Sequence, residues 1–417
     1  MFFANVSFSS TTAEKDTSIS SEILLTNELS EAPFFREADK TIEAFMQQWK
    51  LRGASVAIVK DGRLLYAKGF GYADKEKEIF ATPINTFRIA SVSKLITAIA
   101  IMKLVEEGKI SVNDSVFGPD GILNDEKYSH FTDNRYLAIT VDHLLRHEGG
   151  WNSRYGDHMF MPHYIARYMN KPLPITKETI IEFALKKGLH FMPGTASSYS
   201  NLGYVILGEI IEKISGMDYV DYVNKEILHP LGIWGMRMTS NKYKDKGPLE
   251  VKYYDSPNAK KRLSIYSNTQ YAPKTYEGTD FETLGSAGGW TASAAELMKL
   301  LQGIDGYAVG KDMLSCSIID SMTILDDPEK YAYGWIHSDN QGNWWRTGTL
   351  SGTSAFVMRR CDGISYAFIT NTSTYRGSRF AYDIQEMMQQ AITTITWWPE
   401  KDLFPYLINA ENSFSAE

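Results

Sequence analysis

The chain has 417 residues, of which 43% are hydrophobic and 22% are charged, so it has the length and composition of a globular protein with one large domain or two. Its net charge of -7 and the lack of a basic run argue against a nucleic-acid partner. Two cysteines, Cys316 and Cys361, are too few for a disulfide framework or a zinc cluster. No apolar run reaches the length of a membrane span, so we expect no transmembrane segment.

The amino-terminal residues are rich in serine and threonine, and they contain neither the basic region nor the long apolar region of a signal peptide. Such a composition buries little apolar surface, so we expect residues 1–31 to form a disordered tail. Residues 401–417 are expected to form a second tail at the other end.

The first regular elements are a helix, a hairpin and a second helix. Apolar residues at helical spacing predict an amphipathic helix over residues 35–51. Two apolar runs, 55–59 and 64–70, flank Lys60-Asp61-Gly62-Arg63, and the Asp-Gly pair indicates a hairpin turn. The helix predicted over residues 91–107 is apolar on every side, which is typical of a helix in the middle of a protein.

Helices predominate in the middle of the chain and strands near its end. The polar segment 241–282 is rich in lysine and tyrosine, and we interpret it as a surface insertion because it lacks periodicity. Further helices are expected at 141–147, 175–187, 201–214, 294–301 and 382–395, and strands at 344–347, 354–359 and 364–371.

Strands at both ends with helices between them predict an α/β fold in which the two chain ends build one antiparallel sheet. Helices flank this sheet, and an all-helical domain is inserted in the middle. We assign residues 32–86 and 285–400 to the sheet domain, and residues 87–284 to the helical domain with its insertions.

Lys94 is the only charged residue between Ile89 and Met102. Burying an unpaired ammonium is costly and tends to lower its pKa. Ser91 precedes Lys94 by three residues and so lies on the same helix face, where it has the makings of an activated nucleophile. The alternative is that Ser91 only caps the helix and Lys94 extends to solvent. An S-x-x-K pattern alone decides little, because about one or two occur by chance in a chain of this length.

Two further stretches strengthen the nucleophile hypothesis. Tyr199-Ser200-Asn201 places a phenol and an amide before a helix, after a Pro-Gly turn, and Arg346-Thr347-Gly348-Thr349 places a cation before a glycine that permits close backbone approach. An acyl-transfer enzyme needs a nucleophile, a base, a cation near that base and two backbone donors for an oxyanion. Each stretch alone is also explained as a core tyrosine, a helix cap or an edge strand.

Together, S-x-x-K, Y-x-N and K/H/R-T-G in this order resemble the serine β-lactamase and penicillin-binding protein superfamily, and the middle motif resembles its class C branch. Segments 87–94, 144–150, 193–201, 230–232 and 288–290 also resemble family segments in family order, so the resemblance covers about residues 35–395. It implies a sheet domain packed on a helical domain with the site in the cleft between them. It also implies a periplasmic or otherwise extracytoplasmic location.

The resemblance implies a role for each matching residue. Ser91 would be the acylated nucleophile, Lys94 would help to remove its proton, and Tyr199 would be the partner base or the acid that protonates the leaving group. Asn201 would orient the substrate amide and Lys94, and Thr347 would contact a substrate carboxylate or carbonyl. The backbone N–H groups of Ser91 and Thr349 would form the oxyanion hole, and Arg346 and Gly348 are the other substrate-binding residues of the third motif.

Arg346 stands where class C enzymes usually have lysine and many related esterases have histidine. Arginine is always charged, so it can stabilise a tyrosinate and attract a carboxylate, but it cannot relay a proton. We therefore expect a serine hydrolase that acts on a peptide, amide, ester or β-lactam carbonyl, with a D-peptidase or esterase favoured over a class C-type β-lactamase. A non-catalytic scaffold that binds cell wall or protein is the remaining alternative.

Other site types fit less well. His143 and His147 are four residues apart beside Glu148, but this is not H-E-x-x-H and no third ligand is apparent, so we expect no metal. There is no G-x-S-x-G elbow, and Gly310-Lys311 lacks the rest of a phosphate-binding loop. We expect no cofactor, a small-molecule or peptide substrate, and a pocket walled partly by residues 151–169.

Overall fold

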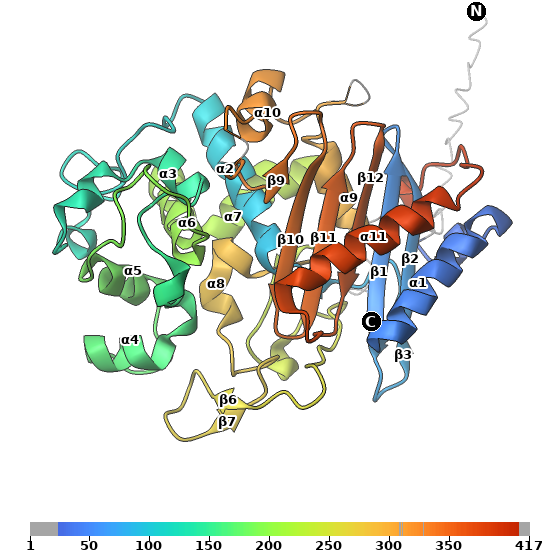
Figure 1. Ribbon diagram of the computed structural model, residues 1–417, viewed down its shortest axis with the longest axis horizontal. Coiled ribbons are helices and arrows are strands. Elements are labelled where there is room, and N and C mark those ends of the chain that lie inside the picture. The colour runs from blue at the N-terminus through green and yellow to red at the C-terminus, as the bar shows by residue number, and fades with distance from the viewer. Residues whose placement is uncertain (1–23, 308–309, 311, 328, 408–417) are drawn as a thin grey trace, which may run out of the picture.

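The computed structural model describes residues 24–307, 310, 312–327 and 329–407 (Figure 1). Its main sheet has the strand order β3-β2-β1-β12-β11-β10-β9, and every neighbouring pair is antiparallel. Figure 1 shows the strands of the first and last parts of the chain side by side, which confirms the predicted fold class. The strands are β1 (Gly53–Lys60), β2 (Arg63–Asp74), β3 (Ile79–Phe80), β9 (His337–Ser338), β10 (Trp344–Leu350), β11 (Thr353–Arg359) and β12 (Ile364–Thr370).

The hairpin of β1 and β2 pairs with a strand from the carboxyl-terminal part of the chain. Asp61 and Gly62 at its turn have φ values of 51° and 75°, and two such residues give a turn whose twist matches that of the strands. Ala57 of β1 pairs with Ala67 of β2 on one side and with Ala367 of β12 on the other. The predicted hairpin is confirmed, and it carries the amino-terminal strands into the carboxyl-terminal part of the sheet.

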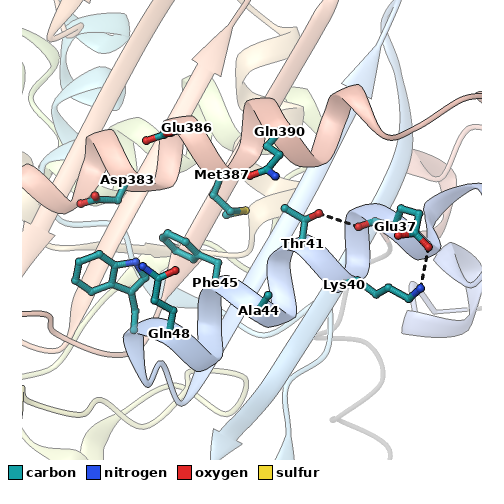
Figure 2. A pocket seen from close by; sticks show the side chains of 11 residues that line it. Glu37, Lys40, Thr41, Ala44, Phe45, Gln48, Asp383, Glu386, Met387 and Gln390 are labelled. Atoms are coloured by element: carbon teal, nitrogen blue, oxygen red, sulfur yellow. Dashed lines mark hydrogen bonds and ion pairs between the residues drawn. The ribbon is translucent and has the colours of Figure 1, made fainter.

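Two helices, α1 (Arg36–Trp49) and α11 (Phe380–Thr393), lie side by side across one face of the sheet (Figure 1). Phe45 of α1 stacks on Phe380 of α11 with ring centroids 5.5 Å apart, within a buried apolar layer between helices and sheet. Figure 2 shows the groove between the two helices, a hollow of about 480 Å³. No residue of the predicted site lines this groove.

On the other face of the sheet, α9 (Ala294–Gln302) packs against β1, β2 and β12. The helices α2 (Ser93–Glu106), α6 (Asn201–Ser215) and α8 (Phe281–Gly288) pack against one another. Leu95, Ile96 and Ile101 point to different sides of α2, and each is at most 2% exposed. The predicted apolar central helix is therefore confirmed. Its start differs from the prediction, because residues Ala90–Val92 form a separate 3-10 turn, η3.

The other predicted helices agree with the structure to within a few residues, and α4, α7, α8 and α10 lie where no separate helix was predicted. A second, three-stranded sheet has the order β4-β8-β5, and a small hairpin lies within the insertion. The elements are α3 (Val141–Leu145), α4 (Pro162–Met169), α5 (Lys177–Leu185), α7 (Tyr219–Val223), α10 (Cys316–Thr323), β4 (Phe87–Arg88), β5 (Arg237–Met238), β6 (Arg262–Leu263), β7 (Tyr271–Ala272) and β8 (Trp290–Ala292). Within the described ranges, no helix is long and apolar enough to cross a membrane.

The expected tails are wrong where the structure describes them. Leu25 is 1% exposed, and its N–H donates to the carbonyl of Tyr406 at 2.9 Å. The N–H of Leu403 donates to the carbonyl of Leu64 at 2.8 Å. Residues 24–31 and 401–407 thus pack together near β2, because each supplies apolar side chains that the other covers. Residues 1–23 and 408–417 lie outside the described ranges.

The proposed domain division stays a prediction, and its boundary between residues 284 and 285 falls inside α8. The surface character expected of residues 241–282 is wrong in part. Polar groups of this region and of the two residues before it surround Arg88, which is 1% exposed. Arg88 donates to Thr239 Oγ1 at 2.8 Å, to the carbonyl of Thr275 at 2.6 Å and to that of Ser240 at 2.8 Å. The insertion is therefore fastened to β4, which leads directly to Ser91.

We expect the change Arg88→Met to lower the free energy of unfolding by about 3–5 kcal/mol, because the buried carboxylate of Glu250, 3.8 Å from Arg88 Nε, would lose its cation. Urea denaturation followed by circular dichroism measures this loss. The double variant Arg88→Met/Glu250→Gln is the control and should recover part of it. A loss below about 1 kcal/mol in the single variant would contradict the expectation.

Candidate active site

Ser91 lies in the tight turn η3 between β4 and α2. The residue before it, Ala90, has a φ of 48°, a value that costs a non-glycine residue conformational energy and is typical of functional sites. Strand β10 packs against this turn at Gly348. A Cβ atom on Gly348 would lie 2.1 Å from the carbonyl oxygen of Ile89 and 3.0 Å from the backbone nitrogen of Ser91. Glycine at this position is thus what allows the strand to approach the turn, as the sequence predicted.

Lys94 is fully buried beneath Ser91. Its Nζ donates to Asn201 Oδ1 at 2.6 Å and to the carbonyl of Ala287 at 2.6 Å, and it lies 3.4 Å from Ser91 Oγ. Ala287 is in the last turn of α8, where helix carbonyls lack an intrahelical partner. Burial and the Arg346 cation together lower the pKa of Lys94 to about 8, although Tyr199 and Asp157 oppose the shift.

Tyr199 and Arg346 face each other across the same site. Arg346 is fully buried, and it donates from Nη2 to the Tyr199 hydroxyl at 2.7 Å and from Nε to the carbonyl of Ser91 at 2.8 Å. Burial raises the pKa of Tyr199, but the positive charges of Arg346 and Lys94 outweigh it, so the pKa of the phenol falls below its usual value. Arg346 could bind a carboxylate through Nε and Nη2 together, but these two donors already bind Ser91 and Tyr199.

The start of α6 positions both Tyr199 and Asn201. Ser200 caps this helix by accepting from the N–H of Gly203 at 3.2 Å, which leaves Tyr199 just before the helix and Asn201 as its first residue. His147 supports the same turn from the end of α3, because its Nδ1 accepts from the N–H of Ser200 at 3.1 Å. Burial, with the nearby charges of Arg346 and Lys94, keeps the pKa of His147 well below its ordinary value, so its ring is neutral beside Tyr199.

These elements meet at a pocket of about 300 Å³. Ser91, Tyr199, Asn201, Arg346, Thr347 and Thr349 line it, whereas Lys94 lies beneath it and Gly348 lies behind Thr347 and Thr349. Phe160 also lines it, which confirms that part of residues 151–169 walls the pocket. Phe160 further borders a second hollow of about 530 Å³, between the start of α4 and the hairpin of β6 and β7.

Three residues beside the predicted site were not assigned a role from the sequence. Asp157 accepts from Asn201 Nδ2 at 2.6 Å, Tyr331 lines the pocket, and the ring of His147 lies 4.4 Å from that of Tyr199. Asp157 and Tyr331 lie in irregular segments, where periodicity carries no signal. The only signal for His147 was its place in a segment that resembles the family.

Asp142, His143 and Glu148 have potential ligand atoms within 4.8 Å of one another. Each is engaged with protein groups: Asp142 with Arg146, His143 Nδ1 with the carbonyl of Ala138, and Glu148 with Ser197. These contacts tie the three side chains to the protein at the end of α3.

Comparison with known proteins places the chain in a family. The sequence profile of the Beta-lactamase family matches residues 38–387. Protein flp of Staphylococcus aureus (strain N315) is 27% identical over 331 residues, which make up 78% of this chain and 60% of that protein. The chain thus spans about 60% of the length of the curated relatives that it matches most extensively.

Solved structures share the fold. The octameric penicillin-binding protein homologue from Pyrococcus abyssi has a TM-score of 0.62 and 27% identity, covering 89% of this chain and 80% of that one. The D-amino acid amidase from Ochrobactrum anthropi SV3 has a TM-score of 0.66, covering 87% and 99%, and its 18% identity shows the fold alone. Since the family profile spans most of the chain, the protein belongs to the Beta-lactamase family.

Proposed function

We propose that the protein is a serine hydrolase that acts through an acyl-Ser91 intermediate on a peptide, amide, ester or β-lactam carbonyl. The surroundings of Lys94 carry this proposal. Two of the three directions around Nζ point to carbonyl oxygens at 2.6 Å, from Asn201 and Ala287, and the third points to Ser91 Oγ at 3.4 Å. A neutral amine held in this way has its lone pair toward Ser91, where it can accept the hydroxyl proton.

In the proposed reaction, Lys94 takes the proton of Ser91 as Oγ attacks the carbonyl carbon. Tyr199, whose pKa is lowered by Arg346 and Lys94, is the second group able to take this proton. The bond to the leaving group then breaks, and the phenol of Tyr199 supplies the proton that the leaving group needs. In deacylation, the Tyr199 phenolate takes a proton from water as the water attacks the acyl-Ser91 ester. Protonated Lys94 then returns its proton to Ser91 Oγ, which restores the phenol, the neutral amine and the serine hydroxyl.

The other predicted residues hold the substrate in this proposal. The close approach of Gly348 to Ser91 supports an oxyanion hole made by the backbone N–H groups of Ser91 and Thr349. Thr347 lines the pocket where a substrate carbonyl or carboxylate would lie. Arg346 acts on Tyr199 by its charge, because the two donors best placed for a carboxylate are already engaged.

We favour a D-peptidase, amidase or esterase activity over that of a class C-type β-lactamase. Arg346 in place of lysine supports this choice. The second hollow beyond Phe160 leaves room for a substrate that extends past the scissile bond. A class C-type β-lactamase is the second candidate, which the Tyr199-Ser200-Asn201 motif favours, and a non-catalytic binding scaffold is the third. An extracytoplasmic location stays a prediction.

Intact-mass measurement after exposure to a fluorophosphonate or a penicillin tests the nucleophile. We expect wild type to gain one adduct, and Ser91→Ala to gain none because the acceptor hydroxyl is gone. Ser93→Ala is the matched control, since it removes another serine hydroxyl two residues away, and it should label like wild type. If wild type gains no adduct, or Ser91→Ala gains the same one, the proposal is wrong.

A panel of substrates ranks the candidate activities. Nitrocefin, a D-Ala-D-Ala depsipeptide, D-amino-acid anilides and short p-nitrophenyl esters each present one of the proposed carbonyl types. Preferential turnover of nitrocefin would favour the β-lactamase alternative, and labelling without turnover of any member would favour the scaffold.

A further inference from the structure

Asp157 lies in the loop between α3 and α4, outside every motif that suggested the site. One of its carboxylate oxygens, Oδ1, accepts from the N–H of Met159 at 3.0 Å and thereby caps the short turn His158–Phe160. The other oxygen, Oδ2, accepts from Asn201 Nδ2 at 2.6 Å. The loop therefore holds the carboxylate, and the carboxylate in turn contacts the amide that binds Lys94.

The orientation of the Asn201 amide decides whether Lys94 has a partner. Asparagine carries an acceptor oxygen on one side of its amide and a donor nitrogen on the other. Oδ1 accepts from Lys94 at 2.6 Å, and a turn of the amide by 180° would place two donors against each other there. An ionised carboxylate only accepts, so Asp157 holds Nδ2 on its own side and Oδ1 on the side of Lys94.

We propose that Asp157 is a positioning residue of this active site, which fixes the amide of Asn201 and through it the direction in which Lys94 faces Ser91. The proposal rests on the proposed function, because it assigns Asp157 to the same acyl-transfer step. The sequence of contacts runs from Asp157 to Asn201 at 2.6 Å, to Lys94 at 2.6 Å and to Ser91 at 3.4 Å.

Asp157 also brings a carboxylate charge close enough to act on Lys94. Tyr199 and Asp157 raise the pKa of Lys94, whereas burial and Arg346 lower it. The neutral ring of His147 and the aromatic ring of Tyr204, 5.5 Å from Nζ, complete the surroundings. Loss of the Asp157 charge therefore lowers the pKa of Lys94, and a rate that requires neutral Lys94 begins to rise at lower pH.

The test uses Asp157→Asn in the full chain. Asparagine keeps an oxygen for the N–H of Met159 and caps turns well, so the loop is retained. It removes the charge and can place a second amide nitrogen against Asn201 Nδ2. We expect acylation by a fluorophosphonate to slow about 10–100-fold, the size of effect that a small misplacement of a catalytic group produces. The rising limb of its pH profile should move to lower pH.

The double variant Asp157→Asn/Asn201→Asp exchanges the two groups. The amide at position 157 can then donate to the carboxylate at position 201, whose other oxygen can accept from Lys94. We expect it to label faster than either single variant, with the rising limb at higher pH because the carboxylate now contacts Lys94. Asp133→Asn, which alters another carboxylate that caps a short turn, is the control and should match wild type.

Three results would overturn the assignment. Equal rates and pH profiles for Asp157→Asn and wild type mean that the contact has no effect on the reaction. A slower variant with an unmoved pH profile and no recovery in the double variant means that Asp157 only anchors the loop. A lower KM in Asp157→Asn, measured with an ester substrate, means that Asp157 competes with substrate for Asn201.

Failure of the proposed function is distinguishable from failure of the Asp157 assignment. A wild-type chain that is never labelled overturns the proposed function, whereas the three results above are obtained with a wild-type chain that is labelled.

Discussion

Replacing Lys94 with methionine should slow acylation of Ser91 by about 10²–10⁴-fold, the usual contribution of a positioned base. Methionine keeps the apolar stem of the side chain in the buried space but has no lone pair that can take the Ser91 proton. The rate of fluorophosphonate labelling at pH 8, followed by intact mass, measures the effect. Thermal unfolding of the same variant shows the separate cost of leaving the Asn201 and Ala287 carbonyl oxygens without a donor.

Two further variants make this prediction specific. Lys94→Arg keeps a positive charge that never gives up its proton, so it should be as slow as Lys94→Met if Lys94 acts as a base. Recovery of the rate in Lys94→Arg would show that only the charge matters. Lys103→Met changes a partly exposed lysine of the same helix that pairs with Glu107, and it should label at the wild-type rate.

Replacing Arg346 with glutamine should move the pH dependence of acylation to higher pH. In wild type, kcat/KM should rise with pH as the coupled pair of Lys94 and Tyr199 loses a proton, and the pKa of Lys94 is about 8. Arg346 lowers the pKa values of both groups, so its removal raises both. The basic form then appears only at higher pH, and the rate at pH 7 falls while the rate at high pH is partly kept.

Arg346→Lys is the matched control for this prediction. It keeps the charge but cannot donate to both Ser91 and Tyr199 as the guanidinium does, so the rising limb should stay near its wild-type pH while the maximal rate falls modestly. A rising limb in Arg346→Gln at the wild-type pH would contradict the electrostatic role. The hydrolysis rate of a p-nitrophenyl ester, measured between pH 6 and 10 for wild type, Arg346→Gln and Arg346→Lys, tests this prediction.

The fold was predictable where local patterns and tertiary packing agree. The spacing of apolar residues predicted α1, and the Asp-Gly pair predicted the hairpin, because both signals act over a few residues. The described parts of the expected tails and residues 241–282 were read wrongly for a common reason. Their polar composition suggested exposure, but Leu25 and Glu250 are buried by partners that are distant in the sequence.

The residues of the candidate site likewise fall into those that local sequence signals predicted and those that they did not. Residues of the three motifs were identified because type, spacing and order together resemble a family, and the structure brings them to one pocket. Asp157 and Tyr331 were missed because they stand in loops whose sequence has no period and no turn signal that points inward. The sequence also left open whether Arg346 binds a substrate carboxylate, and its contacts with Ser91 and Tyr199 bear on that question.

By itself, the sequence determined that Ser91 and Lys94 belong to one short stretch, that Lys94 stands alone as a charge in an apolar helix, and that Tyr199 and Arg346 accompany it in family order. These properties depend on residue type and spacing. Tertiary structure decided what Lys94 touches: Asn201 and Ala287 hold two of its directions, and Ser91 occupies the third. The contacts of Lys94 with Asn201 and Ala287 join residues 107 and 193 positions apart, and only the packing of α2, α6 and α8 against one another brings them within hydrogen-bond distance.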